Sequence, residues 1–293
     1  MGGSMPLARA LKIKKLADAL GAEALNVNLA NVKEDDFKII RDSLHDNGVL
    51  VVRNQALKPA EQTAFTRKFG EIQYHINDEY KMPGNPEILI LSTELDAEGN
   101  NVGIPDAGSD WHSDHSYVDV PTAYTFLQSV ILPKVGGDTQ WIGMVAAYEA
   151  LSSEIKDRID GLVGIHSFNR FRNSRMTRLD RHGDGEAYYS KRSPPDAFHP
   201  IVRTHPHTGK RALFISPRFT LGIKNMDDKE AQPLLDHLFE HLIDERFIYH
   251  HKWQKGDLVI WDNRQTLHLA LGGVKLPEVR RMHRSTVVGE IPV

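Results

Sequence analysis

The chain has 293 residues, of which 40% are hydrophobic and 26% are charged, and this composition predicts a soluble globular protein with a sizeable core. The net charge of −3 gives no overall reason to expect binding to nucleic acid or to an anionic membrane surface. The absence of cysteine excludes disulfides, cysteine-ligated zinc or iron–sulfur clusters, and a cysteine nucleophile.

The sequence carries no segment that we expect to target it to a membrane. It contains no run of about 18 apolar residues, the length needed to span a bilayer, and no apolar signal segment near its start. Residues 1–4, Met-Gly-Gly-Ser, resemble an expression scar. We expect a single domain over residues 5–293. The lack of cysteine fits a reducing cytoplasm.

Four short strands and two helices are expected in the first third of the chain. Asn31-x-x-Glu34 resembles a capping box, and apolar residues then recur at helical spacing until Gly48 ends the helix. Pro59 opens the second helix and Gly70 closes it. The inward faces carry Phe37, Ile40 and Leu44 in the first helix, and Ala64, Phe65 and Phe69 in the second. The strands are expected at residues 11–16, 24–29, 49–52 and 88–91.

The rest of the chain continues to favour strands, with helices between them. A polar, glycine-rich loop at 93–110 leads into a strand that carries His112. Further strands are expected at 123–130, 138–142, 247–253, 258–261 and 280–288, a hairpin at 203–215, helices at 144–159 and 227–244, and loops at 166–200 and 269–278. Many strands with helices at the edges predict an α+β protein, mainly β, built on a single β-sandwich or jelly roll. Neither phosphate-binding glycine loops nor a Gly-x-Ser-x-Gly elbow occur.

The segment Asp110–Tyr117 holds the most informative pair of residues, His112 and Asp114. On a strand, residues two apart point to the same face, so an imidazole and a carboxylate would lie side by side. They are two of the three ligands in a two-histidine-one-carboxylate iron site. The alternative is an ordinary surface or core histidine. A second copy, His182-Gly183-Asp184, lies among glycine and charged residues without a strand pattern.

The late part of the chain offers a third ligand and an anion anchor. His268 follows the apolar strand at 258–261, where it could meet a distant His-x-Asp strand, although a surface turn is the alternative. On the strand that follows, Arg280 and Arg284 share one face with Met282. Two arginines inside a barrel are costly unless they meet anions, and a dicarboxylate suits the guanidinium fork. The alternative is an exposed edge strand.

Four motifs together resemble the iron(II)- and 2-oxoglutarate-dependent taurine / 2,4-dichlorophenoxyacetate dioxygenase family, over nearly the whole chain. They are Trp-His-Ser-Asp at 111–114, Gly-Gly-Asp-Thr at 136–139, Trp-Asp-Asn-Arg-x-x-x-His at 261–268 and Arg-Arg-Met-His-Arg at 280–284. The resemblance implies a double-stranded β-helix, a jelly-roll variant. It also implies an oxidoreductase that uses Fe(II), O2 and 2-oxoglutarate, forms succinate and CO2, and hydroxylates a substrate carbon.

The resemblance also assigns residues to roles. It implies that His112, Asp114 and His268 hold iron, and that Thr139 and Arg280 bind the distal carboxylate of 2-oxoglutarate. It places Arg284 near the metal-chelating end of the cosubstrate and the acidic head of the substrate. Family halogenases lack the carboxylate of the triad, so Asp114 favours hydroxylation, which cleaves the substrate when it occurs next to a heteroatom.

The stretch 247–264 is more similar to the herbicide-cleaving branch than to the taurine enzymes. His75, preceded by Tyr74, occupies the place of a substrate-binding histidine of the taurine enzymes. Gly108 stands where those enzymes are expected to carry asparagine, which argues against taurine itself.

We expect a small organic anion as primary substrate: an aryloxyalkanoate, another carboxylate, a sulfonate or an alkyl sulfate. Its acidic group would lie near Arg284 and His75, and Tyr117 or Phe126 would supply an apolar wall. A basic run within residues 166–200 is either a lid over this anion or a solvated face; its arginines are Arg170, Arg172, Arg175, Arg178 and Arg181.

Two other classes of protein stay open at this point. One is a redox-inert jelly-roll metalloprotein, a hydrolase or isomerase using zinc or manganese. The other is a non-catalytic binding protein, against which the complete triad and Arg280 argue. A homo-oligomer, dimer or tetramer, is also left open.

Overall fold

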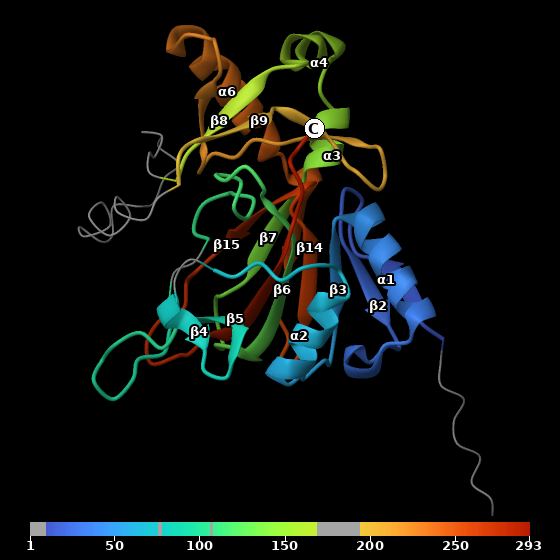
Figure 1. Cartoon of the computed structure of the whole chain (residues 1–293), viewed down its shortest axis with the longest axis vertical. Coiled ribbons are helices and arrows are strands. Elements are labelled where there is room, and N and C mark those ends of the chain that lie inside the picture. The colour runs from blue at the N-terminus through green and yellow to red at the C-terminus, as the bar shows by residue number, and fades with distance from the viewer. Residues whose placement is uncertain (1–9, 76–77, 106–107, 169–193) are drawn as a thin grey trace, which may run out of the picture.

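A large sheet, almost entirely antiparallel, runs through the middle of the molecule (Figure 1), and the computed structural model describes it within residues 10–75, 78–105, 108–168 and 194–293. In order across the sheet its strands are β1 (Lys12–Lys15), β2 (Ala22–Leu25), β3 (Val49–Val52), β14 (Leu258–Asp262), β6 (Thr122–Ile131), β16 (Arg281–Val288), β5 (Asn85–Ser92) and β4 (Lys81–Met82). Segments from both ends of the chain therefore pair at its centre.

Three smaller sheets complete the β-structure of the described residues. They are β13 (Ile248–His251), β7 (Thr139–Gly143) and β15 (Thr266–Ala270); then β12 (Thr220–Ile223), β8 (Val163–His166) and β9 (Ala197–Pro200); and the hairpin β10 (Val202–Thr204) with β11 (Arg211–Leu213). The predicted hairpin at 203–215 is confirmed.

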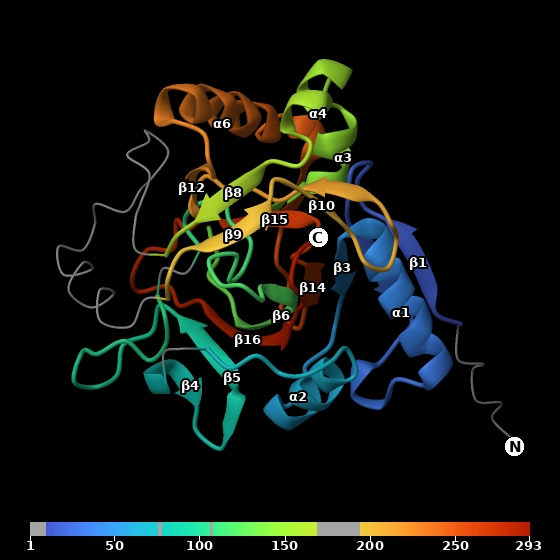
Figure 2. The ribbon, with the colours of Figure 1, turned by 45° about the horizontal axis from the view of Figure 1, so that its top comes forward.

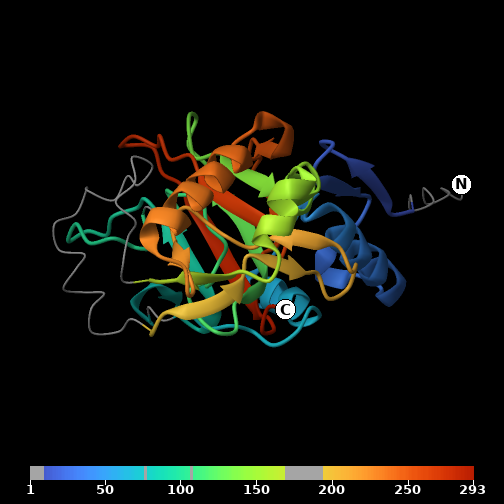
Figure 3. The same ribbon diagram turned by 90° about the horizontal axis from the view of Figure 1, so that it is seen from above.

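The helices lie outside the sheets, as the view from above shows (Figure 3). They are α1 (Glu34–Asn47), α2 (Pro59–Arg67), α3 (Met144–Glu149), α4 (Ser153–Ile159) and α6 (Asp228–Leu242), with 3-10 turns η1 (Leu29–Asn31), η2 (Asp78–Tyr80) and η3 (Glu245–Phe247). No helix in the described ranges is both long and apolar enough to cross a bilayer. Strands in several sheets with helices at their edges make the protein α+β, as predicted.

Three apolar layers hold these elements together. The first joins α1 and α2 to the outer face of the large sheet through residues such as Ile40, Phe65 and Phe126. The second lies between the large sheet and the β13–β7–β15 sheet, where the indole rings of Trp141 and Trp261 are 5.5 Å apart. The third packs α3 and α6 on the far side of that smaller sheet. Figure 2 shows α1 and α2 apart from α3, α4 and α6.

Several local predictions were wrong in instructive ways. Helix α1 begins after Lys33 without a side-chain cap, because Asn31 already belongs to η1. Gly48 ends the helix as predicted, with a φ of 70°. In α2, Ala64 is exposed and Gln62 is buried instead. The helix predicted at 144–159 is two helices, because Ser152 caps a new one by accepting a hydrogen bond from the Ile155 amide.

Candidate metal centre

The two histidines of the predicted triad are joined by their backbones. His112 and His268 form an isolated antiparallel bridge, with the His112 amide 3.1 Å from the His268 carbonyl and the reverse pair at 2.8 Å. His268 lies on β15, so the prediction of a loop beginning at residue 269 was also too early. Directly opposed residues in such a bridge project to the same side, and the two imidazole centroids are 4.1 Å apart.

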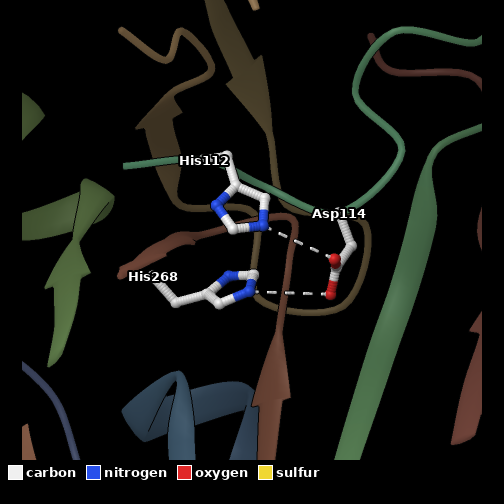
Figure 4. A group of neighbouring side chains, drawn as sticks. All are labelled: His112, Asp114 and His268. Carbon is white, nitrogen blue, oxygen red and sulfur yellow. Dashed lines mark ion pairs between the residues drawn. The ribbon is translucent and has the colours of Figure 1, made fainter. Parts of the chain in front are cut away.

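Asp114 reaches the histidines from a turn rather than from a strand. The prediction that His112 and Asp114 share the face of a strand was wrong, because the chain turns immediately after the bridge residue. The turn places Asp114 Oδ1 3.8 Å from His112 Nε2, and Asp114 Oδ2 4.0 Å from His268 Nε2. Figure 4 shows the three side chains pointing at a common space.

These donor atoms converge without bonding one another. All three lie within 4.8 Å of each other, but the two nitrogen–oxygen distances are too long for hydrogen bonds. Two donors that are each about 2.1 Å from one ion stand about 3 to 4 Å apart. The arrangement therefore fits a divalent metal ion, and two imidazoles with one carboxylate are the donor set of non-haem iron sites.

The protonation states suit metal binding. His112 Nδ1 lies 2.7 Å from the Asp110 carbonyl, which can only accept, so the proton sits on Nδ1 and leaves the Nε2 lone pair free. Burial lowers the pKa of His112 well below its usual value and the pKa of His268 to about 4. Burial alone raises the pKa of Asp114, but Arg284 and the two imidazoles lower it by more, and the group is a carboxylate.

Two residues that the sequence analysis did not assign hold Asp114 in place. Thr125 Oγ1 donates to Asp114 Oδ2 at 2.7 Å and accepts from the Asn263 amide group at 2.9 Å. The other end of that amide, Asn263 Oδ1, accepts from the Asp114 backbone N–H at 3.1 Å. Asn263 belongs to the Trp-Asp-Asn-Arg motif, so the sequence marked this residue as part of a motif but did not indicate that it supports Asp114.

A small cavity of about 40 Å³ adjoins the triad and contains the predicted cosubstrate residues. Its lining includes both histidines together with Thr139, Arg280 and Arg284. Arg280 Nε donates to the Gly137 carbonyl at 3.0 Å, and a Cβ atom at Gly137 would lie 2.8 Å from Arg280 Cδ. Burial lowers the pKa of Arg280 to about 10, so the guanidinium is still cationic at neutral pH. The Thr139 hydroxyl accepts from the Trp253 indole at 3.0 Å.

A larger cavity lies next to this one. The second cavity has a volume of about 450 Å³ and shares Leu91, Ala270 and Arg280 with the first. Its remaining lining comes chiefly from Ile104, Pro105 and Ser109 and from the loop at 271–274. Of the residues shared by the two linings, Arg280 is the cationic one.

The predicted substrate residues fall into two groups. Arg284 forms an ion pair of 3.2 Å with Asp114 Oδ1. Burial and the charge of Arg284 lower the pKa of His75 to about 3, and both residues line a cavity of only about 10 Å³. Tyr74 lies outside these cavities: its side chain is 50% exposed and faces Lys81 Nζ, 5.4 Å from the ring centroid.

Gly108 lies beside the metal centre, and Tyr117 is separated from it by one aromatic ring. Gly108 lines the small cavity with a φ of +81°, and a Cβ atom there would stand 2.9 Å from His112 Cε1. Tyr117 packs at 4.9 Å against Phe219, whose ring is 6.0 Å from His112. Phe126 faces the opposite side of the large sheet, in the layer with α2, so its prediction as a pocket wall was wrong.

Several predicted residues lie outside the described residues. They are His182 and Asp184 of the second His-x-Asp pair, and Arg170, Arg172, Arg175, Arg178 and Arg181 of the basic run.

A second buried cluster of histidine and carboxylate is centred on Asp262, the last residue of β14. Asp262 accepts from Arg264 Nε at 2.7 Å and from Arg264 Nη2 at 2.8 Å, and it lies 2.9 Å from His205 Nε2. His45 stacks on His207 at 4.2 Å, next to this ion pair. Here the side chains bond one another directly.

A fold of packed β-sheets with a buried two-histidine-one-carboxylate centre is typical of non-haem iron enzymes. Comparisons with known proteins identify the family. The chain matches the model of the taurine catabolism dioxygenase TauD, TfdA family over residues 12–286. A 2,4-dichlorophenoxyacetate dioxygenase of a Burkholderia strain, dependent on alpha-ketoglutarate, is 32% identical over 87% of this chain and 86% of its own length. An (S)-phenoxypropionate dioxygenase of Sphingobium herbicidovorans is 29% identical over 96% of both chains.

Solved structures agree with these relatives. The crystal structure of a taurine dioxygenase from Burkholderia xenovorans superposes with a TM-score of 0.80 at 32% identity, over 97% of this chain and 91% of the other. The chain belongs to the taurine catabolism dioxygenase TauD, TfdA family. It is therefore an oxidoreductase that depends on iron(II), 2-oxoglutarate and O2, and the recognition made from its motifs is confirmed.

Proposed function

We propose that this dioxygenase hydroxylates a small organic anion: an aryloxyalkanoate, another carboxylate, a sulfonate or an alkyl sulfate. Where the new hydroxyl lies next to a heteroatom, the product breaks at that bond. The observation that carries the proposal is one cavity lined by both histidines of a convergent two-histidine-one-carboxylate triad together with Arg280 and Arg284. Relatives named for phenoxypropionate, 2,4-dichlorophenoxyacetate, sulfonate and alkyl sulfate chemistry support this range.

His112, Asp114 and His268 are the proposed ligands of the iron. Neutral imidazoles and an ionised carboxylate supply three donors and leave the other coordination positions open. Iron(II) held there supplies the chemistry that couples decarboxylation of 2-oxoglutarate, by O2, to hydroxylation of a substrate carbon. Thr125 and Asn263 keep the carboxylate oriented toward the histidines.

Arg280 and Thr139 are the proposed anchor of the distal 2-oxoglutarate carboxylate. The guanidinium is buried and cationic, and only its Nε is bonded to the Gly137 carbonyl, so its terminal nitrogens can meet a carboxylate. Arg284, already beside Asp114, is proposed to face the metal-chelating end of the cosubstrate and the acidic group of the substrate.

The substrate side is proposed to be bounded by His75, Gly108 and Tyr117. Because a Cβ atom at Gly108 would collide with the His112 ring, an asparagine could not replace this glycine without a backbone shift. This disfavours taurine, whose enzymes are expected to use that asparagine. Tyr74 is half exposed and lines neither cavity, so we do not include it in the proposed pocket.

The fold is proposed to be a double-stranded β-helix in a single domain over residues 5–293. Two observations support it: the β13–β7–β15 sheet packs face to face on the large sheet, and the metal centre lies where both sheets meet. Zero cysteines fit the proposed cytoplasmic location. The loop predicted at 166–200 was too long at both ends, because His166 belongs to β8 and Ala197–Pro200 form β9. The proposed lid is therefore limited to the segment between these strands, most of which lies outside the described residues.

A panel of substrates tests the function. It contains aryloxyalkanoates, alkyl sulfates, sulfonates including taurine, and small carboxylates, and succinate release is measured with and without 2-oxoglutarate and O2. We expect at least one anion to stimulate succinate release that requires both. Turnover of a substrate in the absence of 2-oxoglutarate and O2 would instead establish a redox-inert hydrolase or isomerase.

A further inference from the structure

Trp253 lies behind the two residues that are proposed to anchor the distal carboxylate of 2-oxoglutarate. It follows β13, which ends at His251, and its indole Nε1 donates to Thr139 Oγ1 at 3.0 Å. Its ring centroid is 6.0 Å from the guanidinium carbon of Arg280, which is the outer limit of a cation–π contact. Trp253 itself lines neither of the two cavities next to the triad. One side chain outside these cavities therefore contacts both proposed anchors.

The hydrogen bond from Trp253 decides how the Thr139 hydroxyl can be used. An indole nitrogen only donates, so Thr139 Oγ1 accepts from it and must direct its own hydrogen elsewhere. Thr139 is 3% exposed and lines the small cavity beside the triad. Among the described residues its hydroxyl donates no hydrogen bond, so an acceptor bound in the cavity would receive this hydrogen.

Arg280 adds further donors to the same cavity. Its Nε donates to the Gly137 carbonyl at 3.0 Å, and burial lowers its pKa only to about 10, so the guanidinium is a cation at neutral pH. Thr139 and Arg280 together thus offer hydrogen-bond donors and a positive charge. This combination suits a carboxylate, which only accepts, better than an amide, which brings N–H donors of its own.

A buried carboxylate holds the loop that carries Trp253. Asp257 Oδ2 accepts from His251 Nε2 at 3.0 Å and from the Gln254 backbone N–H at 2.8 Å. It also forms an ion pair of 2.8 Å with Arg53. The imidazole of His251 packs edge-on against the indole, with the ring centroids 4.8 Å apart. Because Asp257 fixes residues on both sides of Trp253, the indole is held in one orientation.

We infer that Trp253 is a positioning residue for the cosubstrate and that it makes the site selective for 2-oxo acids with a distal carboxylate. This role rests on the proposed binding of 2-oxoglutarate by Arg280 and Thr139. Trp253 turns the Thr139 hydroxyl into a donor toward the cavity, and its ring limits the positions that the Arg280 guanidinium can take. The buried Asp257–His251 pair serves the same purpose one step further from the cosubstrate.

Equilibrium binding tests this role without turnover. The protein is loaded with Mn(II) and titrated by calorimetry with N-oxalylglycine, an inert analogue of 2-oxoglutarate. Trp253→Phe keeps a ring near Arg280 but removes the indole N–H. We expect it to weaken N-oxalylglycine binding about fivefold, which corresponds to the net contribution of one hydrogen bond. Trp253→Leu, which removes the ring as well, should weaken binding further.

A double-mutant cycle with Thr139→Val separates positioning from general packing. Thr139→Val alone should weaken N-oxalylglycine binding about tenfold or more, since a hydrogen bond to a charged group is lost. In the Thr139→Val protein, Trp253→Phe should then have little further effect, because the hydroxyl that Trp253 orients is gone. Additive losses would show that Trp253 supports only the packing and would overturn the inference, as would unchanged affinity in Trp253→Phe.

Two further readouts address selectivity and catalysis. The parent protein should prefer N-oxalylglycine to its counterpart with a glycinamide end, and Trp253→Phe should narrow that preference. In steady-state succinate release, Trp253→Phe should raise the KM for 2-oxoglutarate and leave kcat at saturating 2-oxoglutarate close to that of the parent. A lower kcat with an unchanged KM would contradict the assigned role.

The matched control is Gln254→Ala at the next position. The Gln254 side chain is exposed, and the hydrogen bonds that hold this residue are made by its backbone N–H and carbonyl. The substitution should leave N-oxalylglycine affinity unchanged, and a loss as large as that of Trp253→Phe would overturn the inference. Failure of the proposed function has a different signature, because the parent protein itself would then not bind N-oxalylglycine.

Discussion

Asp114 and Asp262 are both buried carboxylates with an arginine and histidines beside them, yet their surroundings differ in one respect. Around Asp262 the partners close on each other, with Arg264 at 2.7 and 2.8 Å and His205 at 2.9 Å. Around Asp114 the imidazole nitrogens stop at 3.8 and 4.0 Å and point at a common space instead.

The comparison shows that residue type alone does not make a metal centre. In both clusters neighbouring charges lower the carboxylate pKa after burial has raised it, so both carboxylates are ionised. In the Asp262 cluster the donor and acceptor atoms bond one another, and these bonds stabilise the fold. In the Asp114 cluster the imidazole nitrogens and the carboxylate do not bond one another. The His112–His268 backbone bridge and the turn that follows His112 hold these side chains apart.

The strongest way to break the comparison is to remove histidines from each cluster. We expect His112→Ala or His268→Ala to abolish stoichiometric Fe(II) binding and turnover, because two donors do not retain the ion. His205→Ala should keep Fe(II) binding and lose about 1–3 kcal/mol of unfolding free energy, since Asp262 loses a partner. Metal analysis and denaturant unfolding measure the two effects.

The control for that experiment is His182→Ala, in the second His-x-Asp pair, which should leave metal affinity unchanged. Full Fe(II) binding by His112→Ala, or loss of it from a folded His205→Ala protein, would contradict the division between the two clusters.

Arg280 offers a third case, because no carboxylate of the described residues lies within hydrogen-bond distance of its guanidinium. Losing one partner of a buried charge pair costs about 2–5 kcal/mol, so Arg280→Ala should raise the KM for 2-oxoglutarate by roughly 30-fold to several thousand-fold. Lysine should rescue only partly, because an ammonium lacks the planar fork. Iron affinity, measured in parallel, should change little. An unchanged KM would move the anchor to Arg284.

Thr125 sharpens the comparison at the level of the residues behind the donors. Thr125→Val removes the hydrogen bond to Asp114 Oδ2 while keeping the side-chain shape. Loss of such a supporting bond costs about 10–100-fold in metal affinity, which a competition titration measures. Ser129→Ala on the same strand is the matched control, since Ser129 bonds Gln254 and Asp257 rather than the triad. Equal metal affinity in Thr125→Val would show that the bridge alone orients Asp114.

The smallest expected effect concerns pH and the structural cluster. Burial lowers the pKa of His45 to about 4 in the folded protein, from about 6.5 when unfolded. Below pH 6.5 the unfolded chain gains a proton that the folded chain does not, so stability falls as pH drops from 6.5 toward 4. At pH 5 these two pKa values correspond to a loss of at most about 2 kcal/mol.

His45→Gln should therefore show a flatter decline in unfolding free energy between pH 7 and pH 5 than the parent protein. Denaturant unfolding at the two pH values gives the difference. An identical decline in both proteins would mean that His45 is already protonated in the folded state.

The sequence predicted most strands and the residues of the triad, because apolar runs and motif spacing are local signals. The strand at Val49–Val52 and the hairpin near His207 were placed correctly for that reason. The motifs also identified the family, which the comparisons confirm. Whether Thr139, Arg280 and Arg284 bind 2-oxoglutarate stays a prediction, although the fold brings them to one cavity.

What the sequence could not supply were relations between distant segments. No local pattern indicated that His112 would form a backbone bridge with His268, which is far away in the sequence. Nor did any local pattern indicate that Asp114 would lie in a turn. Phe126 was misplaced because strand alternation cannot say which face meets the centre.

The backbone bridge between His112 and His268 also bears on which metal the protein acquires. In small zinc domains the ligands come together only when the ion binds, so the free energy of folding depends on which ion is bound. Here reciprocal main-chain hydrogen bonds already set the spacing of the imidazoles, and folding exerts no such selection. We expect Mn(II), Co(II) and Ni(II) to enter the same donor set, in the order of their intrinsic affinities, so that supply at the moment of loading decides which enzyme molecules become competent.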